Sequence, residues 1–430
     1  MSIIPNTASM PEENKISIDV SSEIGELEAV ITHTPGSEVE NMTPQNAERA
    51  LYSDILSLNV ARREYEQFHS VLKKVAGVFE VRDLLNEILR NETVKEGLLK
   101  KICNDPVDPA LFDELTGMES GELSKLLIEG VPMKRDSLTR FLNPQRYAIR
   151  PLHNFFFMRD AAMAIYDQVM TGKMASKVRE RESQIMEAIF RFHPIFNTKT
   201  YSPKAKVPGC EKLSIEGGDV LIARDDVLVI GIGSRTTPAG VDAIVEKLKE
   251  KKGTRHIIVQ ELPEKGESFI HLDMVFTFLN KYECMVYDPV VLQPNRYKTI
   301  HIKIDSGRVE INEEKNIPDT LKKIGWDLEP IHCGGKTDVW TQEREQWHSG
   351  ANFFAIAPGR IIGYGRNNYT LEELSKHGYE VLKAPDVIEN KVDVTSFEKC
   401  VISIEGSELA RGGGGARCMT MPVKRKPVEW

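Results

Sequence analysis

The sequence predicts an α/β protein in which a strand hairpin followed by a helix recurs along most of the chain. Short apolar runs stand in pairs separated by turn residues, and a polar residue precedes each pair, at 161–166, 220–230, 274–287 and 353–364. Amphipathic helical patterns follow, as at 243–251 and 371–377. Such runs are typical of buried strands. The unequal spacing excludes a simple solenoid, whereas about five recurrences favour blades around an axis.

The N-terminal part of the chain begins the same pattern. Residues 25–36 contain an apolar run closed by Pro35 and Gly36, which predicts a buried strand ended by a turn. Thr43 and Pro44 then open an amphipathic helix that extends to Val75, because proline suits the first helical position. We therefore expect residues 1–81 to form the first part of the α/β domain.

Residues 82–148 interrupt this pattern. Leucine and isoleucine recur there at helical spacing in short segments broken by prolines and glycines, and strand patterns are missing. The charges of this segment have the pattern of a solvated face. We interpret 82–148 as an inserted helical subdomain with a structural role, after which the α/β domain resumes over 149–430.

Composition and charge exclude several classes of function. The 430 residues are 41% hydrophobic and 28% charged, as in soluble globular proteins. The net charge of −8 provides no basic surface to attract nucleic acid. No apolar run approaches the ~18 residues of a membrane span. The first residues lack the features of a signal peptide. We expect a cytoplasmic protein that binds neither nucleic acid nor membrane.

The cysteines and glycines exclude further kinds of site. The six cysteines lie far apart, without the paired spacing of a structural zinc site, and fit reduced thiols in a cytosolic enzyme. The glycine patterns of dinucleotide-binding and P-loop proteins are missing, as is the His-Glu-x-x-His pattern of metallohydrolases.

The C-terminal stretch 405–422 contains the first candidate nucleophile. Four consecutive glycines, 412–415, predict a loop, because glycine loses the most backbone freedom on ordering. A short apolar strand, 419–423, follows, and Cys418 stands at the junction beside Arg417. Neighbouring positive charge lowers the pKa of a thiol and favours the nucleophilic thiolate. The alternative is a free cysteine packed as a small hydrophobic residue.

The polar residues that precede the apolar hairpins complete a catalytic set. If the hairpins surround one axis, these residues converge, and the set comprises Asp160, Glu216, His271, Asp273 and Cys418. A nucleophile, a base and three carboxylates indicate a small cationic substrate attacked by a thiolate. Each residue also has a structural interpretation, such as an ion pair of Asp160 with Arg159, a turn at Glu216 or a core position for His271.

Nine motifs in order along the chain resemble the arginine deiminase family. The resemblance covers the chain from about residue 20 to its end and rests on Phe157-Met-Arg-Asp160, Glu216-Gly-Gly-Asp219, Gly231-Ile-Gly-Ser-Arg235-Thr, His271-Leu-Asp273, Cys333-Gly-Gly, Gln342-Glu-Arg-Glu-Gln-Trp347, Gly350-Ala-Asn352, Tyr364-Gly-Arg-Asn367 and Arg417-Cys-Met-Thr-Met-Pro422.

The resemblance implies a guanidine-modifying fold, which is a five-bladed α/β propeller of ββαβ units with an inserted helical subdomain. It also implies hydrolysis of L-arginine to L-citrulline and ammonia, with no metal or organic cofactor. The family forms dimers or larger assemblies, so we expect a homodimer or larger homo-oligomer.

The resemblance also assigns roles to residues. Cys418 attacks the guanidinium carbon, while Asp160 and Asp273 hold the guanidinium nitrogens. His271 protonates the leaving ammonia and then activates water, and Glu216 orients His271. For the amino-acid end of the substrate, the matching positions are Asn154, Arg179 and Arg235.

Some positions depart from the family pattern and leave alternatives open. Met158 replaces the usual threonine before Arg159, and Gly413 stands where some members have an arginine. These differences concern the shape of the hairpin and of the gating loop. The alternatives are a hydrolase of another guanidino compound, an amidinotransferase and an arginine-binding protein without catalysis. Agmatine is disfavoured, since it has no carboxylate to pair with Arg179 and Arg235.

Overall fold

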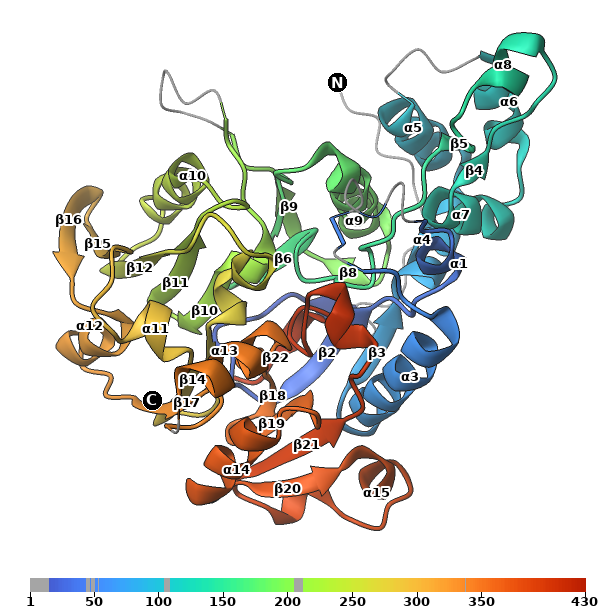
Figure 1. Ribbon diagram of the computed structural model, residues 1–430. Helices are drawn as coiled ribbons and strands as arrows, with labels where there is room; N and C mark the ends of the chain where they lie inside the picture. The colour runs from blue at the N-terminus through green and yellow to red at the C-terminus, as the bar shows by residue number, and fades with distance from the viewer. Residues whose placement is uncertain are drawn as a thin grey trace.

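The computed structural model describes residues 15–43, 47, 51–52, 54–103, 109–204, 212–336 and 338–430. Among these residues, five sheets of three or more strands repeat one arrangement, in which an antiparallel strand pair is extended by a parallel strand. The predicted α/β class is therefore confirmed. Figure 1 shows β6, β10, β18 and β2 toward the middle of the molecule and helices toward its outside.

The sheets are built from short strands with mostly apolar sequences. Their strands are β22 (Met421–Arg425), β2 (Leu27–Thr32) and β3 (Gly77–Glu80); β6 (Ala162–Ile165), β7 (Gln168–Thr171) and β9 (Lys199–Tyr201); β10 (Val220–Arg224), β11 (Val227–Ile232), β12 (Arg255–Glu261), β15 (Thr299–Asp305) and β16 (Arg308–Glu314); β13 (Phe276–Phe278), β14 (Glu283–Val286) and β17 (Glu329–His332); and β18 (Phe354–Ala357), β19 (Arg360–Tyr364), β21 (Cys400–Ile404) and β20 (Glu380–Lys383). The hairpins expected from the apolar runs are thereby confirmed.

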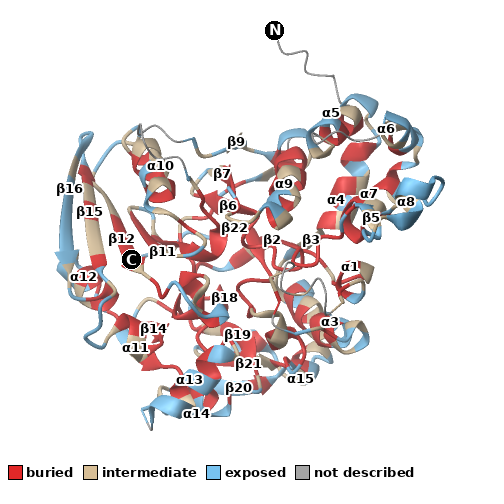
Figure 2. Ribbon diagram, turned by 45° about the horizontal axis from the view of Figure 1, so that its top comes forward, coloured by how far each residue is buried: buried red, intermediate tan, exposed pale blue. Residues whose placement is uncertain are grey.

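In each sheet the connection from the antiparallel pair to the parallel strand contains a helix. These helices are α3 (Leu58–Val75), α9 (Glu180–Phe192), α10 (Pro238–Leu248), α12 (Ile317–Lys323) and α14 (Asn368–Lys376). A parallel strand needs such a crossover, because a tight turn can join only antiparallel neighbours. Figure 2 shows the strands mostly buried and β16 exposed. Strands buried on both faces explain the continuous apolar runs in the sequence.

The remaining elements complete the described part of the chain. Short helices and strands lie between the sheets: β1 (Ile16–Ser17), α1 (Ser37–Glu40), β8 (Phe196–Asn197), α11 (Asp288–Val291), α13 (Val339–Trp347) and α15 (Ala384–Ile388). No helix among the described residues is long and apolar enough to cross a membrane.

The segment 82–148 is mainly helical and projects from one side of the molecule (Figure 1). Its elements are α4 (Val81–Leu89), α5 (Glu92–Ile102), α6 (Pro109–Gly117), α7 (Ser120–Glu129) and α8 (Leu138–Leu142), together with the paired strands β4 (Val131–Pro132) and β5 (Tyr147–Ile149). The helical pattern of the sequence is confirmed, but the expectation that strands are missing was wrong at β4 and β5.

The long helix expected from Thr43 begins only at Leu58. Pro44 lies outside the described residues, and Leu51 has a φ of 67°, which no α-helix contains. Leu56 is buried and lies against the glycine loop, where a Cβ atom at Gly412 would be 3.4 Å from its Cδ1. Leu51 and Leu56 therefore serve tertiary packing instead of a helix face, whereas Ala47 is helical.

The two ends of the chain meet in one sheet. β22 pairs antiparallel with β2, so that Ile31 lies opposite Met421, and β2 pairs in parallel with β3. The segment that contains Cys418 therefore leads directly into a strand fixed by the N-terminal part of the chain.

A single buried carboxylate anchors the loop before Cys418. Glu64 on α3 is fully buried and accepts hydrogen bonds from the backbone N–H groups of Ser407 at 2.9 Å, Glu408 at 3.0 Å and Leu409 at 2.9 Å. Consecutive amides that converge on one carboxylate form strong, charge-assisted hydrogen bonds. The glycine loop therefore starts from a rigid position.

We expect Glu64→Gln to lower the free energy of unfolding by about 1–3 kcal/mol, because the amide nitrogen faces backbone donors that then lack an acceptor. Urea denaturation followed by circular dichroism measures the change. Glu66→Gln, an exposed position on the same helix, is the control and should change the free energy of unfolding by no more than about 0.5 kcal/mol. Equal effects of the two substitutions would contradict the anchoring role.

Candidate active site

Cys418 lies in a turn before β22 and is held by Asn352. The backbone N–H of Arg417 donates to Asn352 Oδ1 at 2.9 Å, and Asn352 Nδ2 donates to the thiol Sγ at 3.2 Å. The close approach requires a glycine at position 415, since a Cβ atom there would lie 2.6 Å from Asn352 Oδ1. Asn352 precedes β18, as the polar residues of the other hairpins precede their strands, but it was not among the predicted site residues.

Asp273 lies beside the thiol and is fixed by a buried arginine. Its Oδ2 atom is 3.6 Å from Cys418 Sγ and accepts from Arg417 Nη1 at 2.8 Å. Arg417 also donates to Glu23 through Nε at 2.9 Å and Nη2 at 3.0 Å. All of these side chains are buried. Glu23 and the structural role of Arg417 were not predicted, because no local pattern signals a contact between residues so far apart in the sequence.

His271 lies between two carboxylates. Its Nε2 atom is 2.8 Å from Glu216 Oε2, and its Nδ1 atom is 3.6 Å from Asp160 Oδ1. Glu216 also accepts from the backbone N–H of Ala175 at 3.0 Å. Glycine is required at position 218, because a Cβ atom there would lie 2.6 Å from the His271 ring. The structure thus brings together the three predicted residues from different sheets.

Asp160 is bound to Arg179 on the far side from His271. Arg179 Nη1 donates to Asp160 Oδ2 at 2.6 Å, and Arg179 Nε and Nη2 donate to Glu182 at 3.0 and 2.8 Å. Glu182, which was not predicted, therefore fixes the orientation of Arg179. Arg235 is half-buried, and its side chain forms no hydrogen bond with the described residues.

A small cavity lies where these groups meet. Its volume is about 20 Å³, and it is lined by Asn154, Asp160, Arg179, Arg235, His271 and Cys418, together with Leu51, Phe157, Ile270 and Gly412 to Gly414. Six of the eight predicted residues line this cavity. Of the other two, Glu216 is bound to His271 and Asp273 contacts the thiol of Cys418. The volume suits about one water molecule. Any larger ligand requires some of these lining residues to move.

The charges of the site are set by burial and by close neighbours. Burial opposes the charged form of Asp160, but His271 and Arg179 outweigh this effect and lower the pKa of that carboxyl. Burial and the carboxylate of Asp273 raise the pKa of the Cys418 thiol. The thiol is therefore neutral in this structure. The expectation that Arg417 favours the thiolate was wrong, because Arg417 is paired with Glu23 and Asp273.

His271 is protonated in this environment. Burial alone would lower its pKa, but Asp160 and Glu216 outweigh burial and raise the pKa to about 9. At neutral pH the imidazolium can therefore donate a proton. Glu216 keeps its charge, since the bond from His271 overcomes burial and lowers the pKa of the carboxyl.

Asp160, Glu216 and His271 could also hold a metal ion, because one donor atom from each lies within 4.8 Å of the others. The same atoms already bind one another or backbone amides, since Asp160 Oδ1 accepts from Gly218 N at 3.2 Å. The arrangement is that of a protonated histidine between two carboxylates.

Comparisons with known proteins agree on one family. The model of the family described as arginine deiminase matches residues 48–425. An arginine deiminase of Borreliella afzelii is 33% identical and covers 97% of this chain and 100% of the relative. That of Listeria monocytogenes serotype 4b (strain F2365) is 31% identical and covers 96% of this chain and 98% of the relative.

Solved structures support the fold. The amidinotransferase SxtG of Microseira wollei has a TM-score of 0.54 at 13% identity, with 96% of this chain and 98% of that chain covered. The N-terminal domain of ArgZ, an arginine dihydrolase of cyanobacteria, has a TM-score of 0.52 at 14% identity, with 93% of this chain and 98% of that chain covered.

We expect a pH titration by NMR of histidine-labelled protein to give a pKa near 9 for His271, with the signal assigned through His271→Asn. Glu216→Gln should lower this pKa by at least about one unit, because it removes the negative partner of Nε2. A pKa at or below the 6.5 of an ordinary histidine in the unsubstituted protein would contradict the charge assignment.

The same shift links His271 to stability. The folded-state pKa lies above the ordinary value of 6.5, so the stabilisation from the charged ring is complete below about pH 6.5 and is lost as the pH rises through about 9.

Proposed function

The chain belongs to the arginine deiminase family, and we propose that it hydrolyses L-arginine to L-citrulline and ammonia at the buried site around Cys418. It is a hydrolase that cleaves a guanidino C–N bond. One observation carries the assignment of the site: two buried carboxylates, Asp160 and Asp273, flank a buried thiol, with a protonated histidine beside them.

Two buried carboxylates favour a planar cation between them. Charge-assisted hydrogen bonds from guanidinium nitrogens would satisfy Asp160 and Asp273 and fix the central carbon against Cys418 Sγ. The same cation offsets the negative charges that raise the pKa of the thiol. We therefore propose that the substrate itself promotes formation of the thiolate, so that the nucleophile becomes reactive only when the site is filled.

The first half of the proposed reaction forms a covalent intermediate. As the guanidinium binds, the Cys418 thiol loses its proton to solvent. Its Sγ atom then forms a bond to the guanidinium carbon, and the bond from that carbon to one terminal nitrogen breaks. His271 delivers the proton that lets this nitrogen leave as ammonia. The product is an amidino-thioether of Cys418. Glu216 stabilises the imidazolium before this step and orients the ring throughout.

The second half hydrolyses the intermediate. Water takes the place of ammonia, and neutral His271 removes its proton as oxygen attacks the amidino carbon. The C–S bond then breaks as the carbonyl group of citrulline forms. The hydroxyl proton passes to the departing sulfur, so the thiol is restored and citrulline is released. One residue thus acts first as an acid and then as a base, and no step requires a metal or an organic cofactor.

The two arginines have different roles in this proposal. Arg179 is bound to Asp160 and Glu182 and would hold Asp160 in place. Because Arg179 also lines the cavity, it would add positive charge near the α-carboxylate of the substrate. Arg235 lines the cavity without a hydrogen bond to a described residue, which supports it as the main partner of the carboxylate. Asn154 would contact the amino-acid end beside them.

We extend the proposal to the organisation of the chain. The five similar sheets support a five-bladed ββαβ propeller, in which 1–81 and 149–430 form the catalytic domain and 82–148 is inserted. We propose a homodimer or larger assembly, because α8 exposes Leu138, Phe141 and Leu142. The described cysteines are free thiols, which supports the cytoplasm as the compartment.

Equimolar citrulline and ammonia should form from L-arginine alone, with EDTA present and without an amine acceptor. Cys418→Ser should reduce citrulline formation at least about 1,000-fold, because the covalent route is lost. Calorimetry should show that this variant still binds L-arginine. Cys103→Ser, a half-buried cysteine of the helical segment, is the control and should keep its activity.

If Cys418→Ser turned over arginine at the rate of the unsubstituted protein, this would contradict the assignment of Cys418 as the nucleophile. Turnover of agmatine or dimethylarginine in place of arginine, or turnover only with an acceptor, would contradict the assigned substrate or the assigned reaction.

We also expect Arg235→Gln to raise the KM for L-arginine at least about tenfold, since it removes a charge-assisted bond to the carboxylate. Steady-state kinetics measures the change, and Arg308→Gln, an exposed position on β16, is the control. An unchanged KM would exclude Arg235 from the binding site.

A further inference from the structure

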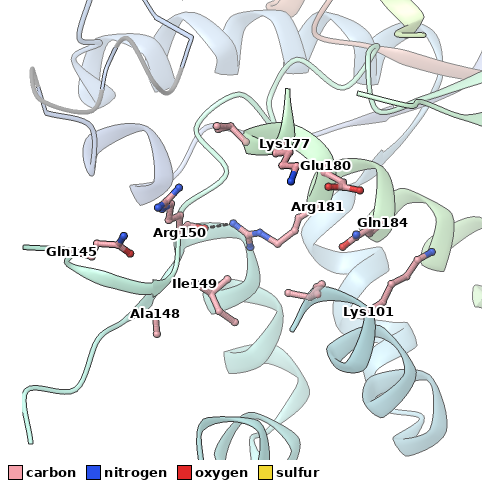
Figure 3. Close-up of a pocket in the computed structure, with 11 residues that line it drawn as sticks. Lys101, Gln145, Ala148, Ile149, Arg150, Lys177, Glu180, Arg181 and Gln184 are labelled. Atoms are coloured by element: carbon pink, nitrogen blue, oxygen red, sulfur yellow. Dashed lines mark hydrogen bonds between the residues drawn. The ribbon is translucent and has the colours of Figure 1, made fainter. Parts of the chain in front are cut away.

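A second and much larger cavity lies between the helical segment and the start of α9. Its volume is about 560 Å³, which falls within the size range of ligand sites. Figure 3 shows residues from three directions around it: Lys101 from α5, Ala148, Ile149 and Arg150 from β5 and the chain after it, and Lys177, Glu180 and Arg181 from the segment that opens α9. The mechanism uses none of these side chains.

The walls of this cavity are rich in positive charge. Lys101, Arg150, Lys177 and Arg181 line it, against a single acid, Glu180. Glu180 lies 3.9 Å from Lys173, and Lys101 is paired with Glu187, so both already have partners. Among the described residues, neither Lys177 nor Arg181 has a salt-bridge partner.

Arg181 is held in place without a carboxylate. Its Nη1 atom donates to the carbonyl of Leu127 at 3.1 Å and its Nη2 atom to the carbonyl of Arg150 (Figure 3). Burial lowers the pKa of Arg181 to about 10, so the guanidinium remains charged at neutral pH. A positioned cation with no negative partner favours an anionic ligand.

The same cavity has an apolar side. Ile102, Ala148, Ile149 and Val178 line it together with the cations. A ligand that fits both sides therefore combines at least two negative charges with a flat or aliphatic group, which is the chemistry of a nucleoside diphosphate or a similar phosphorylated compound.

We propose that this cavity binds a small phosphorylated compound through Arg150, Lys177 and Arg181, and that its occupation changes the binding of L-arginine at the catalytic site. The second part rests on the proposed function.

The coupling follows from alternate residues of one short segment. Lys177 and Arg181 face the larger cavity, whereas Arg179 between them lines the catalytic cavity and donates to Asp160 at 2.6 Å. Residues 177–179 form one 3₁₀ turn that leads directly into α9. A ligand that binds Lys177 and Arg181 would therefore shift the backbone that positions Arg179.

Isothermal titration calorimetry of the full-length protein tests the site, with ADP, pyrophosphate, citrate and adenosine as probes in the absence of metal. We expect ADP to bind with one-to-one stoichiometry, and adenosine not to bind. The double variant Arg150→Gln/Lys177→Gln should weaken ADP binding at least about tenfold. Lys199→Gln, an exposed lysine outside the cavity, is the matched control. Added salt should weaken binding, as for any partly exposed charge contact.

The coupling is tested by the KM for L-arginine with and without saturating ADP. We expect ADP to change this KM at least about threefold in the unsubstituted protein but not in the double variant, since a coupling free energy typically produces changes of this size or larger. Calorimetry does not depend on turnover, so it separates a failure of the site from a failure of the proposed function.

Two results would overturn the site: no heat of binding from any anion at millimolar concentration, or an ADP affinity that the double variant leaves unchanged. Tighter binding of citrate than of ADP and pyrophosphate would overturn the phosphorylated class. A KM unaffected by bound ADP would overturn the coupling.

Discussion

The buried guanidinium of Arg417 is the contact on which the rest of the site depends. It joins Glu23 near the N-terminus, Asp273 in the middle of the chain and the carbonyl of Val220, and the next residue is Cys418. Burial opposes the ionisation of Glu23, but Arg417 and Arg159 outweigh it and lower the pKa of Glu23 to about 2. Removing one partner of such a pair commonly costs about 3–5 kcal/mol, because the other charge remains buried. The contacts that position the thiol therefore also stabilise the fold.

The electrostatic balance of the site explains why a neutral thiol and a charged histidine coexist. Negative charge from Asp160 and Glu216 stabilises the imidazolium, while negative charge from Asp273, together with burial, disfavours the thiolate. Without substrate, Cys418 is therefore a neutral thiol and His271 a charged imidazolium. In a site with a preformed nucleophile, the cysteine would be a thiolate and the histidine neutral. In the proposed reaction the guanidinium of the substrate adds positive charge beside Cys418, so that substrate binding and activation of the thiol are the same event.

Much of this organisation was predictable from sequence, because it is encoded locally. Apolar runs with a turn between them identify the hairpins, and polar residues before them identify Asp160, Glu216 and His271. The missed features depend on contacts between distant segments. Leu51 was assigned to a predicted helix but lines the catalytic cavity beside the glycine loop, and Leu56 packs against the same loop, so tertiary contacts override the local pattern. Glu23 and Glu182 have no distinguishing sequence context, and their roles appear only when Arg417 and Arg179 are placed beside them.

The pairing of β22 with β2 has a consequence for biosynthesis. Cys418 lies just before β22, and β22 completes a sheet begun by β2, although the two strands are far apart in the sequence. During translation one edge of β2 therefore stays unpaired until β22 has emerged from the ribosome. Fragments that end before this point lack both Cys418 and the strand that closes this sheet. Their exposed strand edge makes them recognisable to the chaperones and proteases that remove incomplete chains.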